Sequence, residues 1–301
     1  MTGITGGEVI KQIKTIDEMR EFSATLRGEG RTLAFVPTMG FLHRGHLALM
    51  EEAKKRAGEL IVSIFVNPAQ FGPDEDLDTY PRALERDCDL CREHGAAAVF
   101  TPQAEEMYPE SFQTYIELER LPLHLCGLSR PVFFKGIATV VAKLFNIVNP
   151  HVAVFGEKDY QQLIIIQRMV KDLCFAVDVV GVPIVREKNG LAMSSRNKYL
   201  SAEQRPGALL LYQSLVQAGE MIAQGEINAA IVSQMAQAKL ASCADITVDY
   251  ISICDPVTLD EVECIDGPVL MAMAIMLGKT RLIDNMMMTP AARSSEIKAA
   301  G

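Results

Sequence analysis

The sequence has no tryptophan and no long uninterrupted run of apolar residues. A helix that spans a bilayer needs about 20 consecutive, mostly apolar residues, and no stretch approaches that length. Residues 1–20 also lack the apolar segment behind a basic one that marks a secretory leader. We therefore expect a cytoplasmic protein. With 49% apolar and 22% charged residues, the composition is typical of a soluble globular chain that can build a core.

Positive charge is scarce as well. The 29 Lys and Arg residues are outnumbered by 38 Asp and Glu residues, which gives a formal net charge of -9. A nucleic-acid-binding surface needs clustered basic side chains to neutralise phosphates, so this balance argues against one. We expect no nucleic-acid partner and no membrane partner, although a small basic pocket is still compatible with the overall charge.

The seven cysteines are odd in number and scattered, which favours reduced thiols over a disulfide framework. One segment, CDLCREH, places Cys88, Cys91 and His94 at a spacing that metal sites use. Leu84, Cys88 and Cys91, however, follow the i, i+4, i+7 spacing of the buried stripe of a helix. Since no second Cys/His pair completes a zinc site, we prefer the helical interpretation.

Strand-like and helix-like segments alternate up to about residue 185. The expected strands are 32–36, 60–66, 96–100, 151–155 and 176–184, and the expected helices are 45–57, 80–94, 136–148 and 159–173. Such alternation is typical of a parallel sheet with crossover helices. We therefore predict an α/β fold, with a Rossmann-like doubly wound parallel sheet in residues 1–185 that binds the small-molecule ligands.

The pattern changes after residue 185. Two helix-like segments, 202–224 and 228–241, precede two strand-like segments, 247–253 and 269–277, and these no longer alternate. A chain of 301 residues is also long for a single core. We predict a smaller C-terminal α+β domain at 186–290 that acts as a lid, followed by a flexible tail at 291–301.

The segment FVPTMGFLHRGHLALM joins an expected strand to an expected helix. In an open parallel sheet, ligands bind at the carboxyl ends of the strands, where a helix N-terminus offers free N–H groups to an anion. Gly40 and Gly45 would let a nucleotide approach the backbone, and His43 and His46 could donate to phosphate oxygens. A plain turn with exposed histidines is the alternative, and two histidines alone do not decide between them.

A second polar segment, FGEKDYQQL, follows the expected strand 151–155. Lys158 could reach phosphates there, and Asp159 could reach a ribose hydroxyl. The plainer interpretation is a turn in which Asp159 caps the helix that starts at Tyr160, and the two roles are compatible.

A third polar segment, GLAMSSRNKYLS, lies between the two expected domains. Ser194, Ser195 and Arg196 suit a mobile phosphate clamp, although the composition is also that of an ordinary loop.

Eight segments in the same order resemble one family within the HIGH/KMSKS nucleotidyltransferase superfamily, the pantothenate synthetases or pantoate–beta-alanine ligases. The segments are VPTMGFLHRGH, VSIFVNPAQFG, EDLDTYPR, TVVAKLFNIV, FGEKDYQQL, VGVPIVRE, GLAMSSRNKYLS and KTRLIDN. The resemblance implies a homodimer that joins D-pantoate to beta-alanine with ATP and Mg²⁺. In this family, pantoate attacks the α-phosphorus to give pantoyl adenylate and pyrophosphate, and the amine of beta-alanine then displaces AMP.

The resemblance also implies roles for individual residues. His43, His46, Lys158 and Arg196 become the catalytic candidates, with His46 as the family's proton donor. The implied ATP-binding residues are Pro37, Thr38, Met39, Gly40, Phe41, Leu42, His43, Arg44, Gly45, His46, Gly156, Glu157, Lys158, Asp159, Val185, Met193, Ser194, Ser195 and Arg196.

Pantoate is assigned by resemblance to Gln70 and Gln162, whose neutral amides can donate to a carboxylate and accept from hydroxyls. Without the resemblance, the first would be a loop residue and the second a helix-surface residue. Asn67 and Lys143 are weaker candidates for the same pocket. Asp87 could help to hold Mg²⁺, but its neighbour is Arg86, so phosphates and water would supply most ligands.

Two segments depart from the family pattern. RPVFFKG stands at 130–136 where RPGHFRG is usual, which puts a role near the second substrate in doubt, and REKNG stands at 186–190 in place of REPDG. Two other functions stay open: a nucleotidyltransferase that releases its adenylylated product, and a non-catalytic nucleotide-binding protein. The presence of His43, His46, Lys158 and Arg196 counts against the second.

Overall fold

The computed structural model describes residues 10–73 and 75–290, and the chain divides into two compact units. Among these residues, the first unit comprises 10–187 and 192–197, and the second comprises 188–191 and 198–290. The chain thus enters the second unit briefly and returns to the first before it leaves for good. The tail expected to be flexible, 291–301, lies outside the described residues.

The first unit is built on a six-stranded sheet in which every neighbouring pair is parallel. Its strands are β1 (Lys11–Ile13), β2 (Leu33–Thr38), β3 (Glu59–Ile64), β4 (Ala96–Phe100), β5 (Val152–Gly156) and β6 (Asp178–Val182), in the order β1-β4-β3-β2-β5-β6. From β2 the chain builds outward to β3 and β4, and later to β5 and β6 on the other side. The strand order therefore reverses between β2 and β5, where such sheets bind their ligands.

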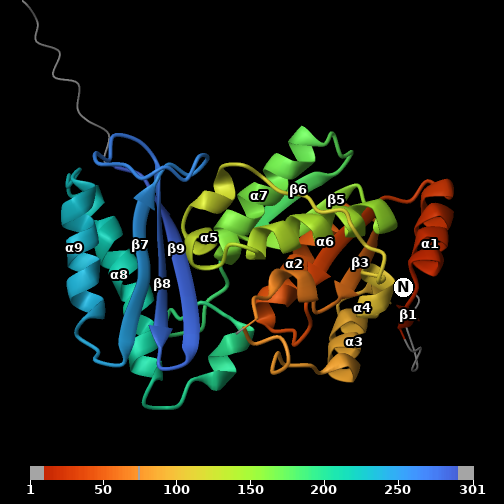
Figure 1. The fold of residues 1–301 in the computed structure, drawn as a ribbon, viewed down its shortest axis with the longest axis horizontal. Helices are drawn as coiled ribbons and strands as arrows, with labels where there is room; N and C mark the ends of the chain where they lie inside the picture. The colour runs from red at the N-terminus through yellow and green to blue at the C-terminus, as the bar shows by residue number, and fades with distance from the viewer. Residues whose placement is uncertain (1–9, 74, 291–301) are drawn as a thin grey trace, which may run out of the picture. The chain divides into compact units, whose positions relative to one another are not determined.

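Helices cover both faces of this sheet, which confirms the predicted doubly wound α/β fold (Figure 1). One face carries α2 (Arg44–Arg56) and α3 (Leu84–Glu93), and the other carries α1 (Ile16–Gly28), α6 (Phe133–Val148) and α7 (Tyr160–Asp172). Two short helices, α4 (Ala104–Met107) and α5 (Cys126–Ser129), lie in the connections, with 3-10 turns η1 (Pro68–Gln70), η2 (Leu121–Leu123) and η3 (Glu157–Asp159). None of the helices in the described part is long and apolar enough to cross a membrane.

Helix α3 explains the cysteine spacing seen in the sequence. Cys88 and Cys91 are buried with Met50 and Val99 in the core between α2, α3 and the sheet. Burial raises the pKa of Cys91 to about 12, so its thiol stays protonated. Within the described ranges, no group of three or more His, Cys, Asp or Glu side chains could hold a metal ion.

Helix α6 is apolar around almost its whole circumference because it is buried on more than one side. It passes close to η1, where the carbonyl of Gly136 accepts a hydrogen bond from Nδ2 of Asn67 at 3.2 Å. A Cβ atom at Gly136 would lie 2.2 Å from the carbonyl oxygen of Ala69. Only glycine permits this approach, and it fixes the turn that carries Gln70.

The second unit is an antiparallel three-stranded sheet with two helices packed on it (Figure 1). The helices are α8 (Arg205–Ala223) and α9 (Ala229–Leu240), and the strands are β7 (Ile246–Cys254), β8 (Val269–Leu277) and β9 (Thr280–Met288) in the order β7-β8-β9. The last 3-10 turn, η4 (Ser195–Tyr199), precedes α8. Strand β9, which the sequence pattern did not indicate, makes the sheet one strand larger than expected.

Replacing Gly136 with Ala tests the contact between α6 and η1. We expect Gly136→Ala to destabilise the protein by about 1–3 kcal/mol, because two backbone segments must move apart to admit a methyl group. Gly28→Ala is the matched control in α1, where a Cβ meets nothing within 4 Å. Urea unfolding followed by circular dichroism should show the control unchanged or slightly more stable. Equal midpoints for the two variants would contradict the close packing.

Candidate active site

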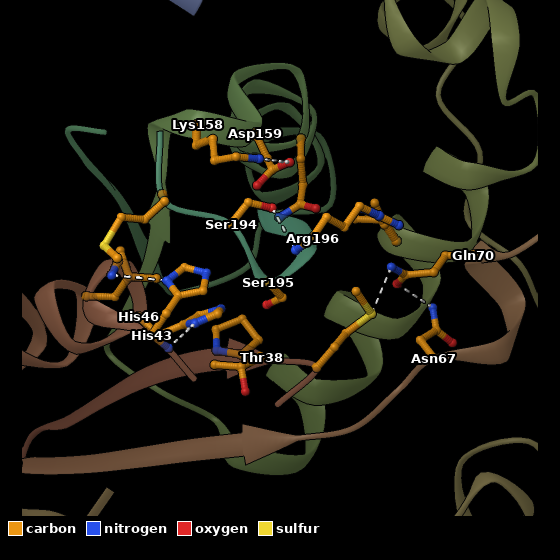
Figure 2. Close-up of a pocket in the computed structure, with 18 of the residues that line it drawn as sticks. Thr38, His43, His46, Asn67, Gln70, Lys158, Asp159, Ser194, Ser195 and Arg196 are labelled. Carbon is orange, nitrogen blue, oxygen red and sulfur yellow. Dashed lines mark hydrogen bonds and ion pairs between the residues drawn. The ribbon is translucent and has the colours of Figure 1, made fainter. Parts of the chain in front are cut away.

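A cavity of about 230 Å³ lies at the carboxyl ends of β2, β3, β5 and β6, within the first unit (Figure 2). It brings together most residues that the sequence singled out: Pro37, Thr38, Met39, His43, Gly45, His46, Asn67, Gln70, Gly156, Lys158, Asp159, Gln162, Val185, Met193, Ser194, Ser195 and Arg196. Other residues named from the sequence do not line it: Gly40, Phe41, Leu42, Arg44, Asp87, Lys143 and Glu157. The three polar segments therefore converge on one cavity.

The two histidines form the N-terminus of α2. His43 is its N-cap residue, and its Nδ1 accepts a hydrogen bond from the backbone N–H of Gly45 at 3.1 Å. Nδ1 of His46 accepts one from the backbone N–H of His43 at 3.2 Å. The ring centroids are 4.1 Å apart. Since each Nδ1 is an acceptor, each neutral ring must carry its proton on Nε2.

Both histidines are kept uncharged by their surroundings. Burial, with a smaller contribution from the nearby Lys158, lowers the pKa of His43 to about 4. Burial lowers the pKa of His46 to about 3, helped by His43 and Lys158. At neutral pH the α2 N-terminus therefore presents two neutral N–H donors, which do not repel a nearby lysine.

The turn before α2 has an unusual backbone. Gly40 and Phe41 both have positive φ, at 84° and 50°. The backbone N–H groups of Phe41 and Leu42 donate to the two carboxylate oxygens of Asp87, at 2.6 and 2.9 Å. Asp87 is buried, and burial raises the pKa of its carboxyl, with the two backbone bonds acting in the opposite direction. Its carboxylate thus faces the turn, not the cavity.

Lys158 and Asp159 follow β5 in the turn η3. The Lys158 Nζ lies 3.9 Å from an Asp159 carboxylate oxygen. Asp159 is the N-cap residue of α7, as the sequence suggested, but its side chain makes no capping hydrogen bond to the helix. Figure 2 shows both side chains on the same side of the cavity as Ser194.

The segment 193–196 approaches the α2 turn from the other side. Ser195 Oγ donates to the carbonyl of Phe41 at 3.4 Å. The Arg196 guanidinium binds Asp76 through two hydrogen bonds, of 3.3 and 3.0 Å. This ion pair raises the pKa of Arg196 despite its burial.

An amide cluster forms the wall opposite the histidines. Gln70 is buried; its Nε2 donates to Met39 Sδ at 3.2 Å, and its Oε1 accepts from Asn67 Nδ2 at 3.1 Å. Gln162 lines the same cavity from α7. Its neighbour Gln161 does not, because its side chain binds the backbone of the 121–126 segment.

Several lining residues were not predicted as site residues. Tyr80 and Arg130 are polar, and α6 contributes an apolar wall of Phe133, Ile137, Val140, Val141 and Leu144. Tyr80 belongs to the segment EDLDTYPR, but this segment alone did not indicate a role for the tyrosine. The Nζ atom of Lys143 lies over the rings of Tyr108 and Phe112, at 5.4 and 4.4 Å from their centroids. Lys143 does not line the cavity, so the structure gives no support to its predicted role in the pantoate pocket.

Known proteins resemble this chain along nearly its whole length. The family model for pantoate-beta-alanine ligase matches residues 11–287. The chain belongs to the pantoate-beta-alanine ligase family. The pantothenate synthetase of Desulfatibacillum aliphaticivorans is 55% identical over 268 residues, with 89% of this chain and 95% of the relative covered. That of Syntrophobacter fumaroxidans is 52% identical over 280 residues, with 93% and 99% covered.

Solved structures of this family have the same fold. Pantothenate synthetase from Thermus thermophilus matches with a TM-score of 0.87 and 46% identity, covering 92% of this chain and 99% of that one. A pantoate-beta-alanine ligase from Francisella tularensis, complexed with beta-gamma ATP and beta-alanine, matches with a TM-score of 0.77 and 31% identity. The match covers 92% of this chain and 97% of the Francisella tularensis chain.

The depressed histidine pKa values predict a loss of stability in acid. Below about pH 6.5 an unfolded histidine binds a proton, whereas folded His43 and His46 stay neutral down to about pH 4 and 3. The free energy of unfolding should therefore fall as pH drops from 6.5 towards 4, by at most about 1.4 kcal/mol per pH unit for each histidine. The double variant His43→Gln/His46→Gln should have a flatter slope. Urea unfolding at several pH values measures both, and parallel slopes would contradict the assignment.

Proposed function

We propose that this protein condenses D-pantoate with beta-alanine to give pantothenate, with ATP converted to AMP and pyrophosphate. The pantoate carboxylate attacks the α-phosphorus, and pyrophosphate leaves. The beta-alanine amine then attacks the acyl carbon of the enzyme-bound pantoyl adenylate, AMP leaves, and the nitrogen loses its proton. Family membership and one cavity lined by both cationic or N–H donors and neutral amides support this reaction.

Two kinds of polar group in the cavity support this assignment. His43, His46, Lys158 and Arg196 offer N–H, ammonium and guanidinium donors, which suit phosphates. Gln70 and Gln162 offer neutral amides, which suit a hydroxy acid. A site for a nucleotide alone would not need these amides.

Adenylate formation needs no protein nucleophile, so donors aimed at the developing charge supply the acceleration. The Nε2–H groups of His43 and His46 donate to phosphate oxygens without carrying charge. Lys158 supplies the positive charge beside them. Because the pKa of His46 is about 3, it serves as a hydrogen-bond donor and not as an acid that gives up its proton at neutral pH.

To bind a phosphate, Arg196 must exchange its ion pair with Asp76 for one with ATP. Its guanidinium is already paired with Asp76, so bound ATP competes with a carboxylate for the same donors. Ser194 and Ser195 stand beside it in the segment that covers the nucleotide. We propose that this segment also shields the adenylate, which water would hydrolyse, until the amine arrives.

Pantoate fits the wall formed by the amides and α6. Its carboxylate must stay nucleophilic, and a cation bound tightly to that group would stabilise the ground state and slow the attack. The amides of Gln70 and Gln162 orient it without that cost. The apolar side chains of Val140, Val141 and Leu144 match the two methyl groups of pantoate.

Magnesium has little support from the protein side chains. Both Asp87 oxygens accept backbone N–H groups, and Asp159 is the single acidic side chain among the described residues that line the cavity. We propose that Mg²⁺ enters on the phosphates of ATP and completes its coordination with water. From family membership we also propose that the protein is cytoplasmic and forms a homodimer. Analytical ultracentrifugation can test the dimer.

Labelled pyrophosphate tests the reaction. We expect exchange of label into ATP only when pantoate is present, without any need for beta-alanine, and AMP release only after beta-alanine is added. Both follow from an adenylate that stays bound. Exchange without pantoate, or AMP release without amine, would favour an enzyme that releases its adenylylated product. ATP binding with no exchange at all would favour a non-catalytic nucleotide-binding protein.

Two substitutions test the phosphate donors. His46→Ala and Lys158→Ala should each lower the single-turnover rate of adenylate formation by on the order of a hundredfold, because each removes a donor aimed at developing charge. Pantoate affinity should change less. His94→Ala and Lys171→Ala are matched controls, since neither side chain lines the cavity. A near-parental rate in either test variant would contradict its assigned role.

A further inference from the structure

We infer that Asp87 is a positioning residue that sets the nucleotide-binding turn before α2, and that it is not a magnesium ligand. The inference concerns one buried carboxylate on α3 and rests on the proposed adenylation. Its side chain is fully buried, and it lies 46 and 45 residues along the chain from the two N–H groups that it accepts.

The turn needs such a partner because its backbone is strained. Phe41 has φ of 50°, a conformation that is unfavourable for a non-glycine residue and persists only where the surrounding structure imposes it. The N–H groups of Phe41 and Leu42 lie between β2 and α2, and burying them unpaired would add a further penalty. The two oxygens of Asp87 satisfy both, at 2.6 and 2.9 Å.

Arg86 completes the attachment from the same helix. Its Nη2 donates to the carbonyl of Leu42 at 2.9 Å, and its guanidinium lies 5.5 Å from the centre of the Phe41 ring. Consecutive residues of α3 therefore bind the N–H and C=O groups of the same short turn. Gly40 fits against them, since a Cβ there would lie 3.2 Å from an Asp87 oxygen.

The turn transmits this attachment to the phosphate donors. Leu42 is followed directly by His43, the N-cap of α2, whose backbone N–H orients His46. The carbonyl of Phe41 accepts the hydroxyl of Ser195. A shift of the turn would move donors on both sides of the cavity, although Asp87 itself does not line it.

A magnesium role conflicts with this geometry. Each Asp87 oxygen already accepts a backbone N–H group, and the carboxylate is fully buried and does not line the cavity where the phosphates would bind. A carboxylate suits Mg²⁺ chemically, but this one is placed against the turn and away from the proposed phosphate site.

Asp87→Asn is the test. The amide keeps the shape but places an NH₂ group against a backbone N–H, so one hydrogen bond is lost and two donors face each other. In pantoate-dependent pyrophosphate exchange, we expect kcat to fall about 10- to 100-fold and KM for ATP to rise. KM for pantoate and the Mg²⁺ concentration for half-maximal rate should stay within about twofold. Amide hydrogen exchange should show loss of protection in the 39–43 segment.

Asp89→Asn is the matched control on the same helix. It makes the same charge change at a carboxylate that is exposed and paired with Arg92, so all these quantities should match the parent. Arg86→Ala is a milder second variant at an exposed side chain. It should raise KM for ATP by a few fold, and it keeps the inference testable even where Asp87→Asn does not fold.

Three outcomes would overturn the inference. A Mg²⁺ requirement raised tenfold or more in Asp87→Asn and rescued by excess Mg²⁺ would make Asp87 a ligand. Reduced kcat with unchanged KM and unchanged protection at 39–43 would make its role one of general stability. Parental kcat and KM values in Arg86→Ala would show that attachment of the turn to α3 does not matter for ATP binding. If the parent showed no pyrophosphate exchange, the proposed reaction would be wrong. Amide hydrogen exchange and direct titration with ATP would still test the role of Asp87 in the turn.

Discussion

The turn between β2 and α2 is held in a conformation that its own sequence disfavours, and the rest of the cavity depends on it. Two successive residues, Gly40 and Phe41, have positive φ, and a carboxylate from a distant helix accepts the backbone N–H groups of Phe41 and Leu42. A strain of this kind persists only where surrounding structure imposes it. Here it holds the start of α2 at the edge of the cavity, where both histidine rings line it.

Sheet topology decides which other groups this turn can meet. Because the strand order reverses between β2 and β5, the ends of these two strands diverge and leave a crevice. Lys158 enters the crevice from β5, and the histidines enter it from β2. Helix α6 closes the crevice with apolar side chains, which is why its sequence has no polar face of the usual width. Close packing at Gly136 then places the amide of Gln70 on the side of the cavity opposite the two histidines (Figure 2).

Periodicity in the sequence predicted the long elements because each buries a continuous stripe or strand, and the βαβ alternation predicted the sheet. Short or late strands escaped it: β1 has three residues, and β9 follows β8 after a brief turn. The site was harder, since Gln161 and Gln162 are adjacent and similar, yet only one faces the cavity. Their roles follow from the rotation of α7 against the 121–126 segment, which no local pattern records. Asp87 was noticed as a carboxylate, but its partners lie too far along the chain for spacing to reveal them.

The cavity is lined by positively charged side chains, although the chain as a whole has a formal net charge of -9. Arg130 and Arg196 both line it, and consecutive carboxylates, Glu75 and Asp76, pair with them. An arginine left unpaired in a partly buried position would lose hydration without compensation, so the carboxylates keep both guanidinium groups oriented before any ligand arrives. In the proposed reaction, ATP phosphate replaces a carboxylate, so one charge-assisted bond is exchanged for another and we expect little net gain from that contact. We therefore propose that discrimination for the nucleotide comes mainly from the neutral histidines and the α2 N-terminus, whose geometry the strained turn sets in advance.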